Sequence, residues 1–374
     1  MKDFDSGDYI NQGTYKSFFP NKINRQWSLD NIEVIDLLSK ADRQLGRLDM
    51  YSDYIPNIDL FISMHVLKEA TQSSKIEGTK TNIEEVLQDK IDIAEEKRDD
   101  WEEVQNYISA LQSAIESLNK IPFSSKLIKQ THKILLKGVR GKYKVPGEFR
   151  TSQNWIGGAS ISDAIFIPPI QSEINNLMSD LEKFTHNEKI LFPDLLKIAL
   201  IHYQFETIHP FLDGNGRVGR LMITLYLVEK MILKKPILYL SDFFERNRSL
   251  YYDNLMRVRE KNDIQQWFKF FLVGVIETAK SSIETFDKIL KLQKEVDEKL
   301  QKLGSRTNNG RAIMNHMYQH PIIDAQKVQK IIDSSMPTVY KLISELETLN
   351  ILQEFTGAKR GKQYWFPEYI KIFS

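Results

Sequence analysis

Residues 209–220, HPFLDGNGRVGR, bring together a histidine, a carboxylate, three glycines, an asparagine and two arginines. His209 is the natural proton acceptor near neutral pH, because an imidazole titrates in that range. Asp213 supplies carboxylate oxygens of the kind that a divalent cation binds together with phosphates. Gly214 and Gly216 lack Cβ atoms, so their backbone can approach a ligand closely. These residue types suit chemistry at a phosphate group.

The segments on either side of this stretch are predicted to be buried helices. Apolar residues recur at helical spacing over 194–208, with His202 expected as aromatic filler, and residues 221–228 are mostly apolar without Gly or Pro. Arg217 and Arg220 are expected in the first turn of the second helix, where unpaired N–H groups and the helix dipole favour an anion. Their guanidinium groups would share one helix face and suit phosphate oxygens. The combination indicates phosphoryl or nucleotidyl transfer.

Three other interpretations of this stretch fit less well. Residues 214–219 match the dinucleotide fingerprint G-x-G-x-x-G, but that fingerprint follows a strand, and here a helix precedes it. Glu206 and His209 have the E-x-x-H spacing of di-iron bundles, but such a site needs two of these motifs, and the sequence has one. A purely structural helix corner would require neither the histidine nor the paired arginines.

The same twelve residues resemble the signature of the Fic (filamentation induced by cAMP) family, H-P-F-x-[DE]-G-N-G-R-x-x-R, with no departure from it. The resemblance extends over most of residues 30–290. It implies a mainly α fold, a Fic helical bundle with a small β-hairpin flap. It also implies a protein adenylyltransferase, in which AMP passes from ATP to a Ser, Thr or Tyr hydroxyl of a protein and pyrophosphate leaves. ATP and Mg²⁺ are the implied cofactors.

The resemblance also implies roles for individual residues. His209 would be the general base, and Asp213 would hold Mg²⁺. The residues implied in nucleotide binding are Gly214, Asn215, Gly216, Arg217, Val218, Gly219, Arg220, Tyr251 and Tyr252. Asn215 would lie near the α-phosphate, and the two arginines would bind the outer phosphates. For the two tyrosines, contact with adenine and ordinary core packing are both open interpretations.

Residues 73–78, SSKIEG, resemble the inhibitory motif of the family, [ST]-x-x-x-E-[GN]. Its position before the Fic core is similar to the class with an N-terminal inhibitory helix, and Ser73 and Glu77 are therefore implied as regulatory residues. A carboxylate beside a phosphate site can pair with one of its arginines. Glu77 would then occupy the place of the γ-phosphate beside Arg220. The resemblance also implies that the same glutamate can support removal of AMP, while an exposed glutamate without function is the alternative.

Length and composition limit the number of domains and the classes of function that are possible. The chain has 374 residues, 41% hydrophobic and 27% charged, enough for two or three domains. The formal net charge of +1 gives no reason to expect nucleic-acid binding by the whole molecule. The absence of cysteine excludes disulfides and cysteine-based metal sites or nucleophiles. The polar N-terminus does not resemble a signal peptide, and no apolar run is long enough to span a bilayer, so a cytoplasmic protein without a membrane partner is expected.

Three domains are predicted. They are an N-terminal helical region over 1–110 with the inhibitory helix at about 59–78, the Fic core over 111–290, and a winged helix-turn-helix domain over 305–374. Residues 1–30 are expected to be an irregular arm, and residues 304–310 a linker by composition. Runs of β-forming residues at 153–156 and 164–167 predict the hairpin flap, which would hold a segment of the target protein as an added strand. A capping box is expected at residues 81–84.

Two functions compete for the C-terminal region. Helices at 311–318, 325–332 and 337–349, followed by two short strands, indicate a winged helix. It would place its last helix in a DNA groove and Lys359, Arg360 and Lys362 on phosphates, although Glu345 and Glu347 oppose this. Docking to a protein or to a second copy of the chain is the alternative. A DNA-binding regulator with a nucleotide-sensing Fic core, or transfer of UMP or phosphate, are the rival functions of the whole chain.

Overall fold

The apolar segment 194–208 forms the most deeply buried helix of the computed structural model, α7 (Asp194–Ile208). All its residues from Leu195 onward are buried, as expected of a helix that is apolar on every side. Helix α8 (Asn215–Glu229) packs against it and is buried over most of its length. The connecting loop, 209–214, is therefore fixed at both ends by the core.

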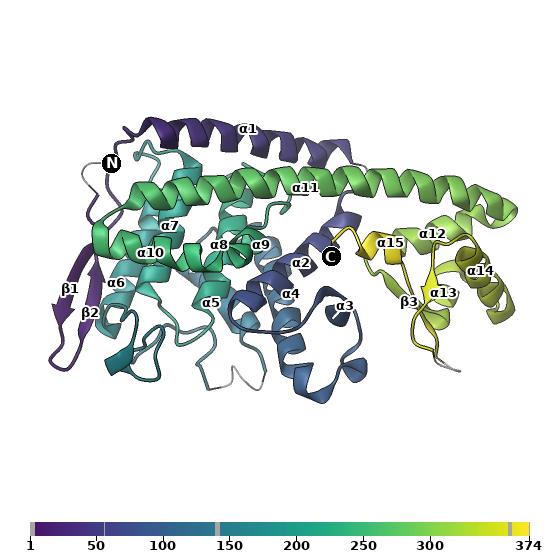
Figure 1. Ribbon diagram of the computed structural model, residues 1–374, viewed down its shortest axis with the longest axis horizontal. Helices are drawn as coiled ribbons and strands as arrows, with labels where there is room; N and C mark the ends of the chain where they lie inside the picture. Colours follow the sequence, from purple (N-terminus) through teal and green to yellow (C-terminus); the bar gives the residue numbers. More distant parts are fainter. Residues whose placement is uncertain (1–3, 56, 139–142, 358–360, 374) are drawn as a thin grey trace.

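Residues 4–55, 57–138, 143–357 and 361–373 are the ones that the structure describes. The helices that complete the bundle around α7 and α8 are α2 (Asp59–Ile76), α3 (Ile83–Val86), α4 (Arg98–Leu118), α5 (Ser125–Leu135), α6 (Ile174–His186), α9 (Ser241–Arg246) and α10 (Arg248–Lys261) (Figure 1). Short 3₁₀ turns lie at Lys90–Asp92, Glu95–Lys97, Ile161–Asp163, Gln171–Glu173 and Gln301–Arg306. Helix α4 runs through the expected domain boundary at residue 110, so that division stays a prediction.

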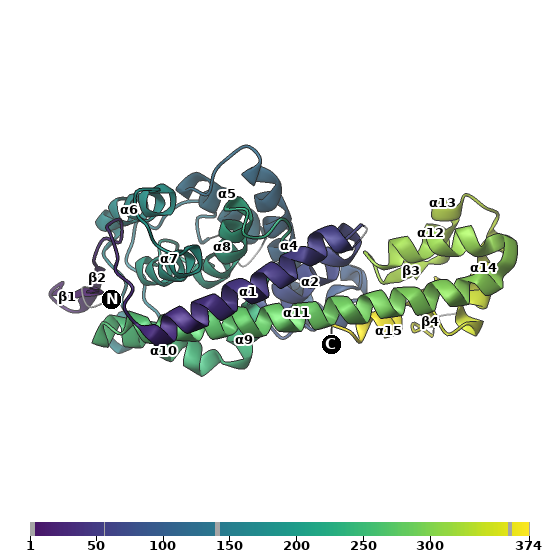
Figure 2. The ribbon, with the colours of Figure 1, turned by 90° about the horizontal axis from the view of Figure 1, so that it is seen from above.

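Two long helices run side by side along the molecule, α1 (Ile32–Tyr54) and α11 (Ile264–Leu300) (Figure 2). Helix α11 contacts α7 and α10 at one end and continues past the bundle to the C-terminal region (Figure 1). Both long helices bury one side and expose the other. In the described part of the chain, no helix combines the length and apolar content that a bilayer span requires.

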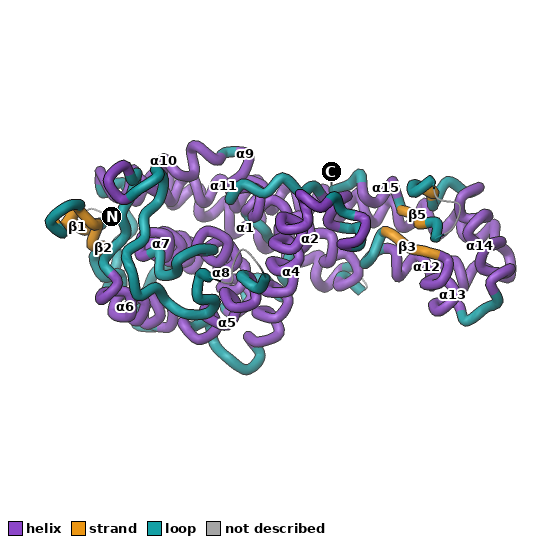
Figure 3. The backbone as a smooth tube through the Cα atoms, turned by 90° about the horizontal axis from the view of Figure 1, so that it is seen from below, coloured by secondary structure: helices purple, strands orange, loops and turns teal. Residues whose placement is uncertain are grey.

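The C-terminal region contains the three helices expected there, as α12 (Thr307–Met317), α13 (Ala325–Ile332) and α14 (Met336–Thr348), followed by the short α15 (Pro367–Ile370). The strands β4 (Gln353–Glu354) and β5 (Gln363–Trp365) pair, and an unexpected strand, β3 (Ile322–Asp324), joins β5 on its other side. The expected basic residues Lys359 and Arg360 lie outside the described residues. Figure 3 shows β3 and β5 beside α12, α13 and α14, and the assignment of this region as a winged helix stays a prediction.

The C-terminal region packs directly on α2, the helix expected to be inhibitory. The ring of Phe61 lies 5.1 Å from that of Tyr318, and the ring of His65 lies 5.1 Å from that of Phe373. Phe61 and Phe373 are both buried. Helix α2 therefore contacts the C-terminal region near the start of the helix. The end of α2 lies beside residues 209–220.

The N-terminal segment is not an irregular arm throughout. Strands β1 (Gly7–Asn11) and β2 (Lys16–Pro20) form an antiparallel hairpin at one end of the molecule (Figure 1). Phe18 is buried with its ring 5.9 Å from Phe166, and its backbone N–H donates to Ile167 O at 2.8 Å. The prediction was wrong because a hairpin this short has little pattern of its own and is stabilised by a tertiary contact.

The expected flap is present as a loop with very little strand. A single antiparallel bridge, Ile156 to Phe166, replaces the two expected strands, and a 3₁₀ turn lies between them. Gly157 and Gly158 both have positive φ, and a Cβ on Gly158 would lie 2.4 Å from Asp163 O. On the other side of the bridge the chain continues into Pro168 and Pro169, which have no N–H to donate to a longer ladder.

Two other local predictions need correction. The capping box lies one residue later than expected, because Asn82 accepts from Glu85 N–H and Glu85 accepts from Asn82 N–H. Residues 304–310 are not a linker: α12 starts at Thr307, and Gly304, with φ of 59°, makes a kink before it. A Cβ on Gly310 would lie 2.8 Å from Leu300 Cδ2. Gly304 thus permits the kink and Gly310 the close packing of two helices, roles that composition alone cannot distinguish from flexibility.

Candidate active site

The motif begins where α7 ends and continues into the first turn of α8. His209 closes α7 in the left-handed conformation, with φ of 49°, and Gly214 precedes α8 with φ of 74°. In the first backbone hydrogen bond of α8, Val218 N–H donates to Gly214 O at 3.0 Å. The amide groups of the three residues before Val218 therefore have no acceptor within the helix and point out of its N-terminal end. Helix α8 begins two residues earlier than the expected first turn, at Asn215.

The side chain of Asn215 stabilises the loop. Its Oδ1 accepts from Phe211 N–H at 2.8 Å, and its Nδ2 donates to Phe211 O at 2.9 Å. Asn215 is buried. The side-chain amide of Asn215 therefore holds the loop in its conformation. The backbone N–H of Asn215 lies at the N-terminal end of α8, where an anion would bind.

His132 is a second residue that holds the motif, and sequence reasoning did not single it out. Its Nδ1 accepts from Gly147 N–H at 2.8 Å, so the ring proton is on Nε2, which donates to Asp213 O at 3.0 Å. The ring stacks on Phe211 with centroids 3.7 Å apart. Burial lowers the pKa of His132 to about 4, so the ring is neutral at physiological pH.

Arg150, another residue not predicted for the site, fastens the loop from the other side. Its Nε donates to His209 O at 3.0 Å, and its guanidinium also donates to Ser152 O at 3.0 Å and to Pro169 O at 2.5 Å. Asn154 Nδ2 donates to Phe211 O at 2.9 Å. Both residues lie where the chain enters the flap, and only the fold brings them to the motif.

Arg150→Ala should lower the free energy of unfolding by about 3 kcal/mol, because several buried carbonyl groups lose their donor. Arg150→Lys should lower it less, since one ammonium can still donate to part of the set. Urea unfolding measures the effect. Arg246→Ala, which removes an exposed arginine paired with Asp242, is the control and should change little. Equal midpoints for Arg150→Ala and wild type would contradict this role.

A cavity of about 450 Å³ lies beside the motif, between the flap and α10. The predicted site residues that line it are Glu77, His209, Gly216, Arg220, Tyr251 and Tyr252. The flap contributes Trp155, whose side chain is partly exposed, and Ile165, which is mostly exposed. The fold therefore brings residues from α2, the motif and α10 to one hollow.

Asp213 and Arg217 lie outside that cavity, in a hollow of about 30 Å³ that Glu103 also lines. Arg217 donates to Glu103 Oε2 at 2.9 Å and, at 3.5 Å, to Asp213 Oδ1. Arg217 is buried, whereas 45% of the Asp213 side chain is exposed. Glu103 on α4 thus holds the first arginine of the motif, a contact that no local pattern indicates.

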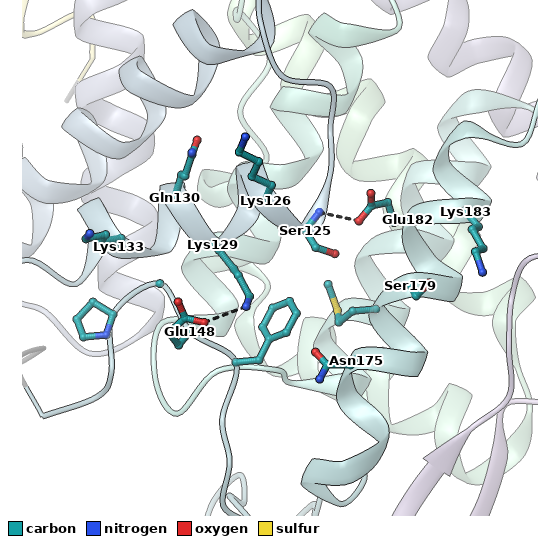
Figure 4. Close-up of a pocket in the computed structure, with 14 residues that line it drawn as sticks. Ser125, Lys126, Lys129, Gln130, Lys133, Glu148, Asn175, Ser179, Glu182 and Lys183 are labelled. Atoms are coloured by element: carbon teal, nitrogen blue, oxygen red, sulfur yellow. Dashed lines mark hydrogen bonds and ion pairs between the residues drawn. The ribbon is translucent and has the colours of Figure 1, made fainter.

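A larger hollow, about 670 Å³, lies elsewhere, between α5 and α6 (Figure 4). None of the predicted site residues lines it. Its two glutamates are engaged locally: Glu148 pairs with Lys129 at 2.9 Å, and Glu182 accepts from Ser125 N–H at 2.9 Å (Figure 4). Size alone therefore does not identify the candidate active site.

Glu77 lies against Arg220. Its Oε1 accepts from Arg220 Nη2 at 2.7 Å, while Ser73 accepts from the same guanidinium through Oγ at 2.9 Å and its carbonyl at 2.8 Å. The Arg220 side chain is 1% exposed and that of Glu77 33%. Burial acts to raise the pKa of Glu77, but the charge and hydrogen bond of Arg220 outweigh it and lower that pKa. The carboxylate is therefore ionised at neutral pH.

Gly216 permits this pair to form inside the motif. A Cβ at this position would lie 2.3 Å from Glu77 Oε1 and 3.0 Å from Arg220 Nη1. Any larger residue would displace the carboxylate. The glycine that would let a phosphate approach the helix end is thus also the one that lets Glu77 approach it.

Two stretches of the chain match families of known proteins. Residues 35–116 match the family described as Fic/DOC family N-terminal, and residues 122–227 match the one described as Fic/DOC family. Together the two matches cover half of the chain. The chain belongs to the Fic/DOC family.

Named relatives and a solved structure agree with this. A probable protein adenylyltransferase from Aquifex aeolicus is 30% identical over 213 residues, which cover 54% of this chain and 58% of that protein. Protein adenylyltransferase Fic from Aedes aegypti is 32% identical over 129 residues, which cover 33% of this chain and 22% of that protein. The matches therefore span less than two thirds of these relatives. The crystal structure of a Fic family protein from Desulfovibrio desulfuricans, at 18% identity, shares the fold with a TM-score of 0.57 over 91% of this chain and 98% of that one.

The histidine of the Fic motif is poised as a neutral base. Burial lowers the pKa of His209 to about 3, and the positive charges of Arg259 and Arg150 act in the same direction, whereas Glu77 opposes them. The side chain is 19% exposed, but Nδ1 is buried. The imidazole is therefore unprotonated at physiological pH and can accept a proton.

The two tyrosines on the Fic helix α10 differ. Tyr251 is buried, and its OH is 2.8 Å from Nε2 of His202, whose Nδ1 is 2.9 Å from Gly219 O. His202 is thus a bridge between α7, α8 and α10 rather than aromatic filler. Tyr252 is 39% exposed and faces the cavity. The geometry favours packing for Tyr251 and ligand contact for Tyr252.

Proposed function

We propose that this Fic protein is a protein adenylyltransferase that transfers AMP from ATP to a Ser, Thr or Tyr hydroxyl of a protein and releases pyrophosphate. The observation that carries the proposal is one cavity lined by His209, Gly216 at the N-terminal end of α8, and Arg220. A base, an anion-binding helix end and a buried arginine are what this reaction requires. The names of the Aquifex and Aedes relatives support the same activity.

The residues of the site have distinct roles in this transfer reaction. His209 takes the proton of the attacking hydroxyl, whose oxygen forms a bond to the α-phosphorus as the bond to pyrophosphate breaks. The free amides and dipole of α8 stabilise the negative charge that develops on the phosphate oxygens. Gly214, Gly216, Val218 and Gly219 keep this helix end close to the nucleotide. Arg220, and Arg217 once released from Glu103, bind the outer phosphates.

Asp213 would hold Mg²⁺. The part of its carboxylate that is exposed, on a loop fixed by His132, is a hard oxygen ligand next to the anion-binding helix end. Such an ion usually binds one or two carboxylates, phosphate oxygens and water, so one aspartate fits. When bound, Mg²⁺ would neutralise phosphate charge.

Glu77 holds the enzyme inactive in this proposal. Its carboxylate, bonded to the buried Arg220, occupies the place where the γ-phosphate would bind. Ser73 fixes the same guanidinium through two bonds. A second role of Glu77 in removing AMP is part of the proposal, since an ionised carboxylate in the cavity can also orient a water molecule.

The protein substrate would approach over the flap, where Trp155 and Ile165 are exposed beside the cavity. The chain itself is one candidate substrate. Binding of DNA or of a protein by the C-terminal region, formation of a homodimer, and a cytoplasmic location complete the proposal and rest on the sequence alone.

Tyr252→Ala should raise KM for ATP about 5- to 10-fold, because an aromatic contact of roughly 1 kcal/mol is lost in the cavity. Tyr251→Phe should leave KM unchanged and lower the free energy of unfolding by about 1 kcal/mol, because the bond to His202 is lost. Steady-state kinetics and urea unfolding distinguish the two. Equal KM values for Tyr252→Ala and wild type would remove Tyr252 from the nucleotide site.

The test of the function uses three labelled donors. With ATP labelled at the α-phosphate, Glu77→Gly protein should label itself or an added protein, and ATP labelled at the γ-phosphate should leave no label. Label from the γ-phosphate would show phosphate transfer, and preference for α-labelled UTP would show UMP transfer. No label from any donor, combined with salt-sensitive binding to duplex DNA, would support the regulator in which the Fic core senses nucleotide.

A further inference from the structure

Glu206 has a carboxyl group in the cavity to which the proposed reaction assigns no role. Glu206 lies on α7, three residues before His209, and its side chain is 8% exposed. It lines the same cavity as His209 and Arg220. Its Oε1 is buried and has no hydrogen-bond partner among the described residues. A buried oxygen without a hydrogen-bond partner lowers the stability of the fold, so its presence calls for a functional explanation.

Nδ1 of His209, the ring nitrogen nearest to the Glu206 carboxyl group, is also buried. Glu206 Oε2 lies 3.9 Å from His209 Nδ1, which makes no hydrogen bond of good geometry in the described chain. The backbone carbonyl of Glu206 is the other oxygen that acts on this ring. The two residues are three positions apart at the end of one helix, where side chains at this spacing meet. A small rotation of either side chain would turn this contact into a hydrogen bond of ordinary length.

The surroundings of Glu206 leave space for its carboxyl group and hold its backbone. A Cβ at position 219 would lie 2.3 Å from Glu206 Oε1, so the carboxyl has space because residue 219 is glycine. The Fic signature leaves this position open. On the opposite side, Arg259 Nη2 donates to the Glu206 carbonyl at 3.2 Å, and Arg259 Nε donates to Thr207 Oγ1 at 3.1 Å. The end of α7 that carries both residues is therefore held in place.

Charged groups from four elements act on this pair. Burial raises the pKa of Glu206 to about 7, Glu77 on α2 raises it too, and Arg220 on α8 and Arg259 on α10 oppose the rise. For His209, burial is the largest effect and Arg259 and Arg150 add to it, whereas Glu77 and the Glu206 carbonyl oppose it. The carboxylate form of Glu206 therefore grows as the pH rises through neutrality.

We propose that Glu206 is a positioning residue for His209: its carboxylate accepts a hydrogen bond from Nδ1–H, which leaves Nε2 as the nitrogen that takes the proton. This inference rests on the proposed function of His209. As the hydroxyl oxygen bonds to the α-phosphorus and pyrophosphate leaves, the hydroxyl proton moves to Nε2. Glu206 then offsets the positive charge of the imidazolium, as a carboxylate behind a catalytic histidine does.

The test compares Glu206→Gln and Glu206→Leu in full-length Glu77→Gly protein. Because a positioning group acts on the base and not on the nucleotide, kcat should fall about 10-fold for the glutamine and about 100-fold for the leucine variant. KM for ATP should stay within about twofold. The parent's kcat should rise with pH as Glu206 ionises, and this rise should be absent in Glu206→Gln. Because Glu77 contributes to the wild-type pKa of about 7 for Glu206, the midpoint in the Glu77→Gly parent should lie below that value.

A spectroscopic measurement tests the same inference without catalysis. In ¹⁵N spectra at pH 8, His209, assigned by its loss in His209→Ala, should be the Nδ1–H tautomer in the parent and a mixture of tautomers in Glu206→Gln. Glu229→Gln, a carboxylate at the other end of α8, is the matched control and should retain both the pH profile and the tautomer. Thermal melts check that each variant folds; if the leucine variant does not fold, the near-isosteric glutamine variant decides.

The possible failures are distinct. If Glu77→Gly transfers AMP but Glu206→Gln retains its kcat, pH profile and tautomer, the positioning role is overturned and the proposed function stands. If no variant transfers AMP, the proposed function fails, and an unchanged tautomer in Glu206→Gln would overturn the positioning role independently.

Discussion

Glu77→Gly should raise the rate of AMP transfer by about 10- to 100-fold, the factor that corresponds to one charged hydrogen bond of roughly 1.5–3 kcal/mol. The bond in question joins Glu77 Oε1 to Arg220 Nη2 at 2.7 Å. Without the carboxylate, Arg220 is free to bind the outer phosphates of ATP. Incorporation of α-labelled AMP, measured as initial rates at ATP concentrations well below KM, gives the factor directly.

The same variant should be less stable than wild type. Removing one partner leaves Arg220 buried, and Ser73 alone still accepts from it. A higher rate with a lower melting temperature is therefore the expected combination. Glu84→Gly, which removes an exposed carboxylate from the next helix, is the matched control for the rate, which should not change. Its melting temperature should fall only slightly, by the amount that a glycine in a short helix costs. A rate for Glu77→Gly no higher than that of wild type would refute the inhibitory role.

His209→Ala, introduced into Glu77→Gly protein, should lower kcat about 10²- to 10⁴-fold, the range for loss of a general base. The structure gives the reason: burial lowers the pKa of His209 to about 3, so a neutral imidazole faces the cavity throughout the physiological range. ATP affinity should change little, because the phosphates are bound by α8 and the arginines. Calorimetric titration of ATP alongside the labelling assay separates binding from chemistry.

A remote histidine provides the control for His209→Ala. His316, half-buried on α12 of the C-terminal region, can be replaced by alanine without touching the cavity, and the rate should not change. If His209→Ala retained labelling within about tenfold of its parent, the proton would need another acceptor. Glu206 would be the first residue to examine, since it lines the same cavity.

Continuous segments of the sequence were enough to predict the family of this protein and the helices that carry its motif. The order of residues 209–220 identified the Fic motif, and the apolar run 194–208 predicted a buried helix, because both signals lie within one continuous segment. The same holds for residues 73–78, which resemble the inhibitory motif of the family. The pairing of Glu77 with Arg220 followed from the chemistry of a carboxylate beside a phosphate site, and the structure places the two side chains in contact.

Tertiary structure alone decided which other residues serve the motif. Arg150, His132 and Glu103 reach it from segments 59, 81 and 114 positions away in the contacts they make, so no local spacing marks them. The N-terminal hairpin likewise depends on a contact with a distant residue, Ile167, and Gly310 in the C-terminal region serves packing. Local periodicity records which side of a helix is buried, but not the partner that buries it. Only the folded chain shows that Gly219 makes room for Glu206 beside His209.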